Sequence, residues 1–192
     1  MARFEAAAAA DRLAPVITLQ CLGMRPEEAC GLRWRNVSLT AGTLSIRTVR
    51  TLVDGRPVEK GAKTDAGKRT LPLDDALMAA LKQFRAAQAA EKLAAGPAYS
   101  DGGYVACDEL CRPLDPARLR RVWYRLMKQA EVPKVTPYTA SRHAAASYLA
   151  NVARVSPAVI AAWHGHSDAS FTMKTYVPRP AGGPGRSARR AR

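Results

Sequence analysis

The sequence contains few acidic residues, few cysteines and few aromatic residues. Its 192 residues include 16 Asp and Glu against 30 Lys and Arg, 4 Cys and 6% aromatic side chains. Four irregularly spaced cysteines are too few for a disulfide framework, so we expect reduced, buried thiols. No apolar run approaches the ~20 residues of a membrane span, and the N-terminus lacks the apolar core of a signal peptide. These absences predict a cytoplasmic protein and argue against secreted disulfide-rich domains and membrane proteins.

Basic residues dominate the charge that is present. The formal charge is +14 and the isoelectric point about 10.2, which favours a polyanionic partner such as nucleic acid. Residues 179–192 carry five arginines and no acid, yet the remaining chain still has 25 basic against 16 acidic residues. A coding bias toward arginine gives the same excess, so charge alone leaves the partner open.

The hydrophobic fraction of 47% predicts one globular domain, which we place at residues 1–178. Residues 179–192 are too rich in Pro, Gly and Arg to fold alone, and we expect them to form a disordered basic tail.

Apolar periodicity and turn residues predict a mainly α-helical chain with a small antiparallel β-sheet, an α+β fold. Helices are expected over 5–22, from Pro26, over 74–93, over 115–126, from Pro137 through Leu149, from Ser156 through Trp163, and around Tyr176. Strands are expected over 43–51, 69–73 and 104–106, with a hairpin turn at Asp54-Gly55. The predicted helix over 115–126 carries four arginines, which suit either a phosphate backbone or solvent: Arg118, Arg120, Arg121 and Arg125.

Five short motifs follow one another along the chain and contain the candidate site residues. They are Gly23-Met-Arg-Pro-Glu-Glu28, Lys63-Thr-Asp-Ala-Gly67, Thr136-Pro-Tyr-Thr-Ala-Ser-Arg-His143, Gly165-His-Ser167 and Tyr176. Guanidinium groups bind phosphate oxygens through paired donors. A tyrosine hydroxyl, with a free pKa of ~10, attacks a phosphodiester only where cationic groups crowd the phosphate. Each residue alone is more typical of a surface ion pair or a solvated turn, and it is their order that indicates a site.

This ordered set resembles the catalytic domain of the tyrosine recombinases, the phage integrase family. The resemblance runs from about Leu13 to Pro178 and includes Gly31-Leu-Arg-Trp-Arg-Asn-Val37 after the first arginine. It implies a site-specific recombinase or integrase that cuts and rejoins DNA through a 3′-phosphotyrosine intermediate. It also implies a reaction without a metal or a nucleotide cofactor, because arginines stabilise the charge and the phosphodiester energy is kept.

The resemblance implies a role for each of five catalytic candidates. Tyr176 attacks the phosphate, and Arg25 and Arg142 hold its non-bridging oxygens. Lys63 protonates the leaving 5′ oxygen from a turn between two strands. His166 hydrogen-bonds the phosphate as charge builds up.

Three further residues are implied to support the chemistry. Glu28 orients neighbouring groups. The family commonly has His-x-x-Arg in the middle motif, and the residue three positions before Arg142 is Thr139, which cannot act as a base near neutral pH. His143 is the neighbouring candidate for proton handling, although the family's histidine at this place looks structural.

The implied partner is double-stranded DNA, bound by a tetramer in a synapse with accessory DNA-bending or directionality proteins. Members of the family usually carry an N-terminal DNA-clamping domain and a C-terminal docking helix, and neither is evident here. Two further interpretations stay open: a truncated, non-catalytic DNA-binding remnant of an integrase, and a type IB topoisomerase acting as a monomer. A general polyanion binder is a weaker alternative, because it has no use for Tyr176.

Overall fold

The computed structural model describes residues 2–61 and 67–165 of the chain. Its helices are α1 (Ala2–Ala9), α2 (Ala14–Cys21), α3 (Pro26–Gly31), α4 (Asp75–Ala95), α5 (Pro116–Gln129), α6 (Ala144–Asn151) and α7 (Pro157–His164). Its strands are β1 (Val37–Ser38), β2 (Thr43–Ile46), β3 (Thr48–Val53), β4 (Arg56–Gly61) and β5 (Arg69–Pro72). A π-helical turn, Tyr138–His143, leads directly into α6. The fold is mainly helical with small antiparallel sheets, as the sequence predicts.

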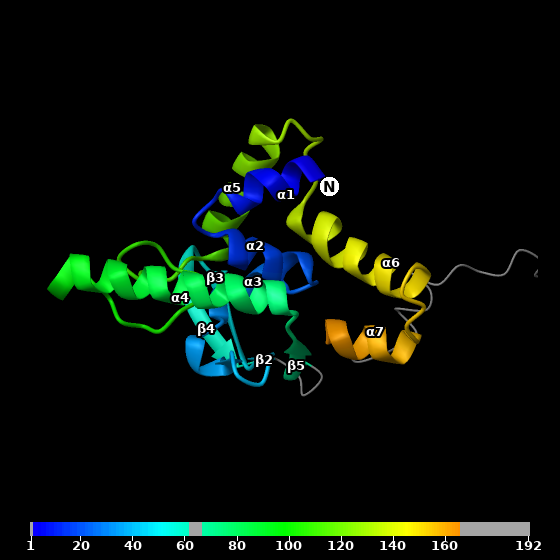
Figure 1. Ribbon diagram of the computed structural model, residues 1–192, viewed down its shortest axis with the longest axis horizontal. Coiled ribbons are helices and arrows are strands. Elements are labelled where there is room, and N and C mark those ends of the chain that lie inside the picture. The colour runs from blue at the N-terminus through cyan, green and yellow to red at the C-terminus, as the bar shows by residue number, and fades with distance from the viewer. Residues whose placement is uncertain (1, 62–66, 166–192) are drawn as a thin grey trace, which may run out of the picture.

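Helices α1 to α5 pack around one main core, and α6 and α7 enclose a smaller cluster. Helix α1 lies against α5, α2 contacts α3 and α4, and α6 lies beside α7 (Figure 1). The rings of Phe4 and Trp123 join α1 to α5, with centroids 4.7 Å apart. The helices predicted over 74–93 and 115–126 are confirmed as α4 and α5, each slightly longer at its C-terminal end. Within residues 2–61 and 67–165, no helix is long and apolar enough to cross a bilayer.

The β-structure forms two sheets where the sequence predicts one. Strands β1, β2 and β5 form an antiparallel three-stranded sheet, and β3 pairs with β4. The strand predicted over 43–51 is interrupted at Arg47, because Ile46 pairs with β5 whereas Thr48 pairs with β4. The hairpin predicted at Asp54-Gly55 is confirmed, with φ values of 50° and 74° that this tight turn requires.

The single helix predicted over 5–22 is wrong, because the chain turns between α1 and α2. Pro15 lies in the first turn of α2, where a backbone N–H is not needed. Inside a continuous helix, the same proline removes a hydrogen bond and clashes with the preceding turn. Asp11 stabilises the turn, since its carboxylate accepts a hydrogen bond of 2.9 Å from the Leu13 N–H.

The segment before α5 does not form the short strand predicted around Tyr104. Tyr104 instead makes an isolated antiparallel bridge with Arg33. Gln88 of α4 holds the next residue, since its amide nitrogen donates to the Val105 carbonyl oxygen at 3.1 Å. The Gln88 amide oxygen accepts from the Trp34 indole N–H at 2.7 Å. Side chains therefore replace the strand pairing that the sequence pattern suggests.

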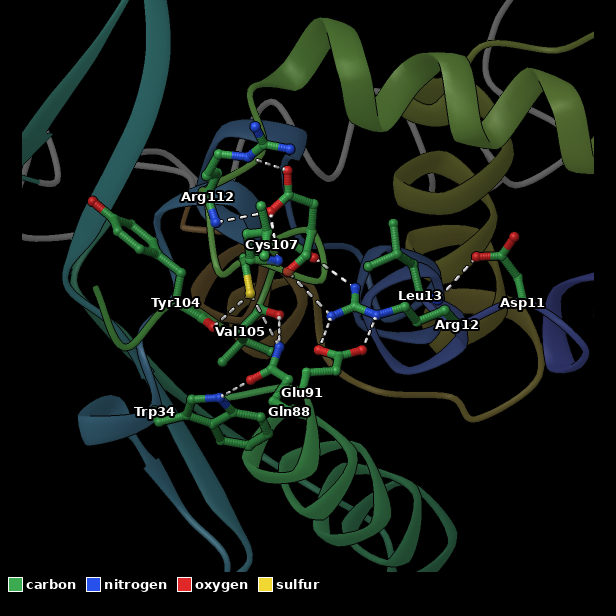
Figure 2. A network of polar contacts seen from close by, with 12 residues as sticks. Asp11, Arg12, Leu13, Trp34, Gln88, Glu91, Tyr104, Val105, Cys107 and Arg112 are labelled. Carbon is green, nitrogen blue, oxygen red and sulfur yellow. Dashed lines mark hydrogen bonds and ion pairs between the residues drawn. The ribbon is translucent and has the colours of Figure 1, made fainter. Parts of the chain in front are cut away.

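A second polar contact fastens this segment to the turn between α1 and α2 (Figure 2). The Arg12 guanidinium donates two hydrogen bonds of 2.6 Å to the Glu91 carboxylate and one of 2.7 Å to the Cys107 carbonyl oxygen. The network joins three parts of the chain that are far apart in sequence.

The four cysteines are free thiols, and three of them, Cys30, Cys107 and Cys111, are buried. Burial raises the pKa of the partly buried Cys21 to about 11. A raised pKa keeps a thiol protonated and unreactive at neutral pH. These thiols therefore belong to the packing of the fold.

Gly31, the last residue of α3, allows a close approach between α3 and β3. A Cβ atom added at Gly31 lies 2.6 Å from the Thr48 carbonyl oxygen and 2.9 Å from the Val49 Cα. We expect Gly31→Ala to lower the free energy of unfolding by about 1–3 kcal/mol, because the backbone must shift to admit the methyl group. Gly61→Ala is the control, since a Cβ there meets no atom within 4 Å. Urea unfolding measures both variants, and equal midpoints would contradict this packing.

Candidate active site

Glu28 is the centre of a buried ionic cluster. It lies in the first turn of α3 and is 2% exposed. Its two carboxylate oxygens accept hydrogen bonds from the Arg69 guanidinium at 2.9 and 2.8 Å. Arg25 donates to the same carboxylate through its backbone N–H at 2.8 Å and its guanidinium at 2.6 Å. The carboxylate therefore has the cationic partners that a buried charge requires.

Arg25 is held at the start of α3 by the local sequence. Pro26 follows it in the first helical turn, where the fixed φ of proline suits the helix, and Arg25 itself is extended with φ −68° and ψ 148°. Glu28 accepts from the Arg25 N–H, one of the donors that a helix N-terminus leaves open. The Arg25 side chain remains 35% exposed. It is therefore available to a ligand from solvent.

Two arginines bind the C-terminal end of α7. Arg69, the first residue of β5, donates from Nε to the Trp163 carbonyl oxygen at 2.6 Å. Arg142 donates from one terminal nitrogen to the His164 carbonyl oxygen. The last carbonyl groups of a helix lack helical partners and carry its partial negative charge, so they attract cations. The end of α7 thus positions both guanidinium groups.

Gly23, in the turn between α2 and α3, completes the surroundings of Arg142. Its carbonyl oxygen accepts from the second terminal nitrogen of Arg142 at 2.9 Å. Its φ is +95°, and a Cβ there lies 2.4 Å from the His164 ring, so glycine alone fits. The Trp163 indole N–H donates to the Leu22 carbonyl oxygen at 2.8 Å, which joins the same turn to α7.

The cluster of Arg25, Glu28, Arg69 and Arg142 is positively charged, since three guanidinium groups surround one carboxylate. Burial by itself raises the pKa of Glu28, but hydrogen bonds and charge from Arg69, together with Arg25, hold that pKa below its ordinary value. Burial and the neighbouring Arg25 lower the pKa of Arg142 to about 10. Glu28 and Arg142 are therefore both ionised at neutral pH, and the excess positive charge favours a bound anion.

The structure brings together three of the residues singled out in the sequence, Arg25, Glu28 and Arg142. The other two described candidates have different neighbours. The Thr139 hydroxyl oxygen lies 2.9 Å from that of Thr136, and the His143 ring meets the edge of a neighbouring tyrosine ring. Among the described residues, no group of three or more His, Cys, Asp or Glu side chains is placed to hold a metal ion.

Lys63, His166 and Tyr176 lie outside the described residues, as do the helix predicted around Tyr176 and the tail over 179–192. The described chain ends one residue before His166. Gly165 caps α7 in the left-handed conformation, with φ 61°, and immediately precedes His166. The backbone therefore enters the Gly-His-Ser motif directly from the helix end that binds Arg142.

Arg69 is a site residue that the sequence motifs did not indicate. It was expected only as the first residue of a strand. The alternation of side chains along β5 could have indicated it. Arg69 lies two residues before the buried Leu71, so both side chains are on the inward face of the strand. An arginine on an inward strand face needs a buried anion, and Glu28 supplies it.

Comparison with known proteins assigns the chain to a family. The model of the phage integrase family matches residues 1–180. The chain belongs to the phage integrase family. A curated relative within this family, the "Tyrosine recombinase XerC-like" protein of Caldanaerobacter subterraneus subsp. tengcongensis, is 30% identical over 167 residues. The match covers 81% of this chain and 42% of that protein, so the chain spans less than half the relative's length.

Solved structures of other integrases and recombinases share the fold. The Tn1549 transposon integrase, in complex with circular intermediate DNA, matches 93% of this chain and 60% of its own, with a TM-score of 0.73 and 20% identity. The XerA recombinase matches 93% of this chain and 58% of its own, with a TM-score of 0.71 and 20% identity. The mainly helical architecture with small antiparallel sheets is therefore that of the tyrosine recombinase catalytic domains.

Proposed function

We propose that this phage integrase family member is a site-specific DNA recombinase that cleaves and rejoins duplex DNA through a 3′-phosphotyrosine. The observation that supports the proposal most strongly is the positively charged cluster at the end of α7. It combines a partly exposed arginine with two that are buried and fixed by backbone carbonyl groups. Such preorganised donors stabilise a phosphate whose negative charge increases during reaction.

In the proposed reaction, the Tyr176 hydroxyl loses its proton to solvent, its oxygen bonds to the scissile phosphorus, and the bond to the 5′ oxygen breaks. Lys63 donates a proton to the leaving 5′ oxygen. Arg25 contacts a non-bridging phosphate oxygen directly, and Arg142 stabilises the developing charge from its buried position. His166 adds a hydrogen bond to the same phosphate. A second DNA end then reverses these steps and reseals the strand.

Glu28 and Arg69 act on this reaction through their neighbours. Glu28 binds the guanidinium groups of both Arg25 and Arg69, so it sets the direction in which Arg25 points. Arg69 ties Glu28 to the end of α7. We propose that both are positioning residues, because their polar atoms bond to the protein itself.

Double-stranded DNA is the proposed substrate, and the structurally similar Tn1549 integrase is in complex with circular intermediate DNA. Exchange between two duplexes needs several active sites at once. We therefore propose a tetramer on paired sites, assisted by accessory DNA-bending or directionality proteins in the cytoplasm. Exposed Arg120 and Arg121 on α5 are candidates for phosphate-backbone contacts.

A pool of nicked duplexes with randomised sequence tests the proposal. A nick close to the cleavage point makes the released fragment, which carries the free 5′-hydroxyl, short enough to diffuse away. The strand cannot be resealed without it, so the covalent intermediate accumulates. The protein is mixed with the pool, denatured with detergent, and assayed for DNA that migrates with protein, while plain binding is measured in parallel. Adducts with a sequence preference support the recombinase. Binding without adducts contradicts it and favours the non-catalytic remnant, whereas adducts together with relaxation of supercoils by the monomer favour a topoisomerase.

A further inference from the structure

The π-helical turn Tyr138–His143 changes which side chains share a face with Arg142. In an α-helix, a residue faces those three and four positions further on. A π-helical turn closes its hydrogen bonds one residue later, between positions i and i+5, so a residue faces those four and five further on. Tyr138 stands four positions before Arg142 and five before His143. The turn therefore keeps Tyr138 on the side of Arg142 and moves Thr139, three positions before Arg142, away from it.

The side-chain contacts agree with this geometry. The rings of Tyr138 and His143 meet edge to face, with centroids 4.9 Å apart and an interplanar angle of 86°. Tyr138 also affects the charge of the Arg142 guanidinium. Burial and Arg25 lower the pKa of Arg142, whereas Tyr138 raises it. Tyr138 is 42% exposed, so its ring is accessible to a ligand. Tyr138 thus shares a helix face with the buried arginine and also reaches the surface.

Thr139 is engaged elsewhere. Its hydroxyl oxygen lies 2.9 Å from the Thr136 hydroxyl oxygen, and its backbone N–H donates to the same Thr136 oxygen at 3.2 Å. This local pairing turns the Thr139 side chain back toward the start of the helix. Ser141 supports the wide turn, because its hydroxyl donates to the Pro137 carbonyl oxygen. Of Tyr138 and Thr139, only Tyr138 stands at the four-residue spacing that shares a face with Arg142 in this turn.

We propose that Tyr138 is a catalytic residue whose phenol donates a hydrogen bond to the anion held by Arg25 and Arg142. The inference rests on the proposed function, in which that anion is the scissile phosphate. A phenol is both a donor and an acceptor, so it binds a non-bridging phosphate oxygen through its O–H. It also carries an aromatic ring that shields the phosphate from water on one side. The π-helical turn leaves this group, and not Thr139, on the side of Arg142.

Adduct formation on the nicked duplexes tests the role of the phenol. Tyr138→Phe removes one oxygen and keeps the ring, and we expect the rate of adduct formation at saturating DNA to fall about 10- to 100-fold. Tyr148→Phe is the matched control, since Tyr148 is an exposed tyrosine on the following helix α6. Thermal unfolding of both variants shows whether folding is intact. A purely structural role for Tyr138 would lower the unfolding temperature and leave the rate per folded molecule unchanged.

Thr139→Val tests the competing assignment taken from the sequence. The inference predicts a smaller loss of rate for Thr139→Val than for Tyr138→Phe. It is overturned if wild-type protein forms adducts and Tyr138→Phe forms them equally fast. It is also overturned if Thr139→Val shows the larger loss. In either of these results the wild-type adducts remain, so the proposed recombinase activity stands.

Anion binding separates failure of this inference from failure of the proposed function. If wild-type protein forms no adducts, the recombinase proposal fails. The role of Tyr138 is then tested by titrating inorganic phosphate into protein labelled with ¹³C in its tyrosine rings and recording the ring signals by NMR. The Tyr138 ring signal is the one that disappears in Tyr138→Phe. If Tyr138 contacts the anion, phosphate shifts this signal in the wild-type protein. Phosphate then also binds more weakly to Tyr138→Phe than to Tyr148→Phe. Equal phosphate affinity in the two variants overturns the inference.

Discussion

Tyr176→Phe should abolish the covalent protein–DNA adduct and leave DNA binding unchanged. The substitution removes only the hydroxyl oxygen that would bond to phosphorus, and phenylalanine has no other nucleophilic atom. The four residues of the cluster, Arg25, Glu28, Arg69 and Arg142, are untouched, so the positive charge of the proposed DNA site remains. Detergent-resistant adducts and the binding constant, measured on the same nicked duplexes, give the two quantities.

Tyr148→Phe is the control for this prediction, because it makes the same chemical change at an exposed position of α6. It should form adducts at the wild-type rate. Adducts formed by Tyr176→Phe as fast as by the control would remove Tyr176 from the proposed mechanism.

Glu28→Ala should lower the free energy of unfolding by about 3–5 kcal/mol, the usual effect of removing one partner of a buried ion pair. Glu28 is 2% exposed and the Arg69 side chain 7%, so the substitution leaves Arg69 buried without its anion. Arg25 also loses the acceptor of its guanidinium and backbone hydrogen bonds. Glu27→Ala is the matched control, because Glu27 lies in the same helical turn and is partly exposed. Urea unfolding at neutral pH measures both variants. Equal losses of unfolding free energy in Glu28→Ala and Glu27→Ala would refute a central role for Glu28.

The stabilisation from Glu28 should depend on pH in a defined direction. Although burial opposes it, Arg69 and Arg25 hold the folded-state pKa of Glu28 below its ordinary value of 4.5. The charged carboxylate therefore stabilises the fold above that value, and the contribution declines as pH falls through the lowered folded-state pKa. The difference in unfolding free energy between wild type and Glu28→Gln should be largest near neutral pH and shrink in acid. A constant difference from pH 7 to about pH 3 would contradict the ionic account.

Local signals in the sequence predict those elements whose boundaries depend on a few neighbouring residues. Pro26 and the acids after it indicate the start of α3, and Asp54-Gly55 indicates the β3–β4 hairpin, because each uses local backbone chemistry. The break before α2 also has a local signal, because Pro15 is incompatible with one continuous helix. The alanine-rich composition of this segment favours a single helix, and the prediction followed the composition. The division of 43–51 between two sheets depends on distant strands and is not encoded in that segment alone.

The candidate site shows the same division. The order of the motifs was enough to group Arg25, Glu28 and Arg142, and the structure brings these three together. Counting residues in the middle motif pointed to Thr139, because such counting assumes an ordinary α-helix. The π-helical turn adds one residue to that helix, and nothing in the spacing reveals it. Arg69 depends on the inward face of β5 meeting the end of α7, a contact between segments far apart in the chain.

The most direct test of the account is to identify the residue and the DNA end that are joined in the covalent adduct. Adducts from the nicked duplexes are digested with protease and nuclease, and the modified peptide is sequenced by mass spectrometry. The account predicts a phosphodiester between Tyr176 and a 3′ end, with a free 5′-hydroxyl on the released fragment. Attachment through another residue, Tyr138 included, attachment to a 5′ end, or cleavage without any protein linkage would contradict it.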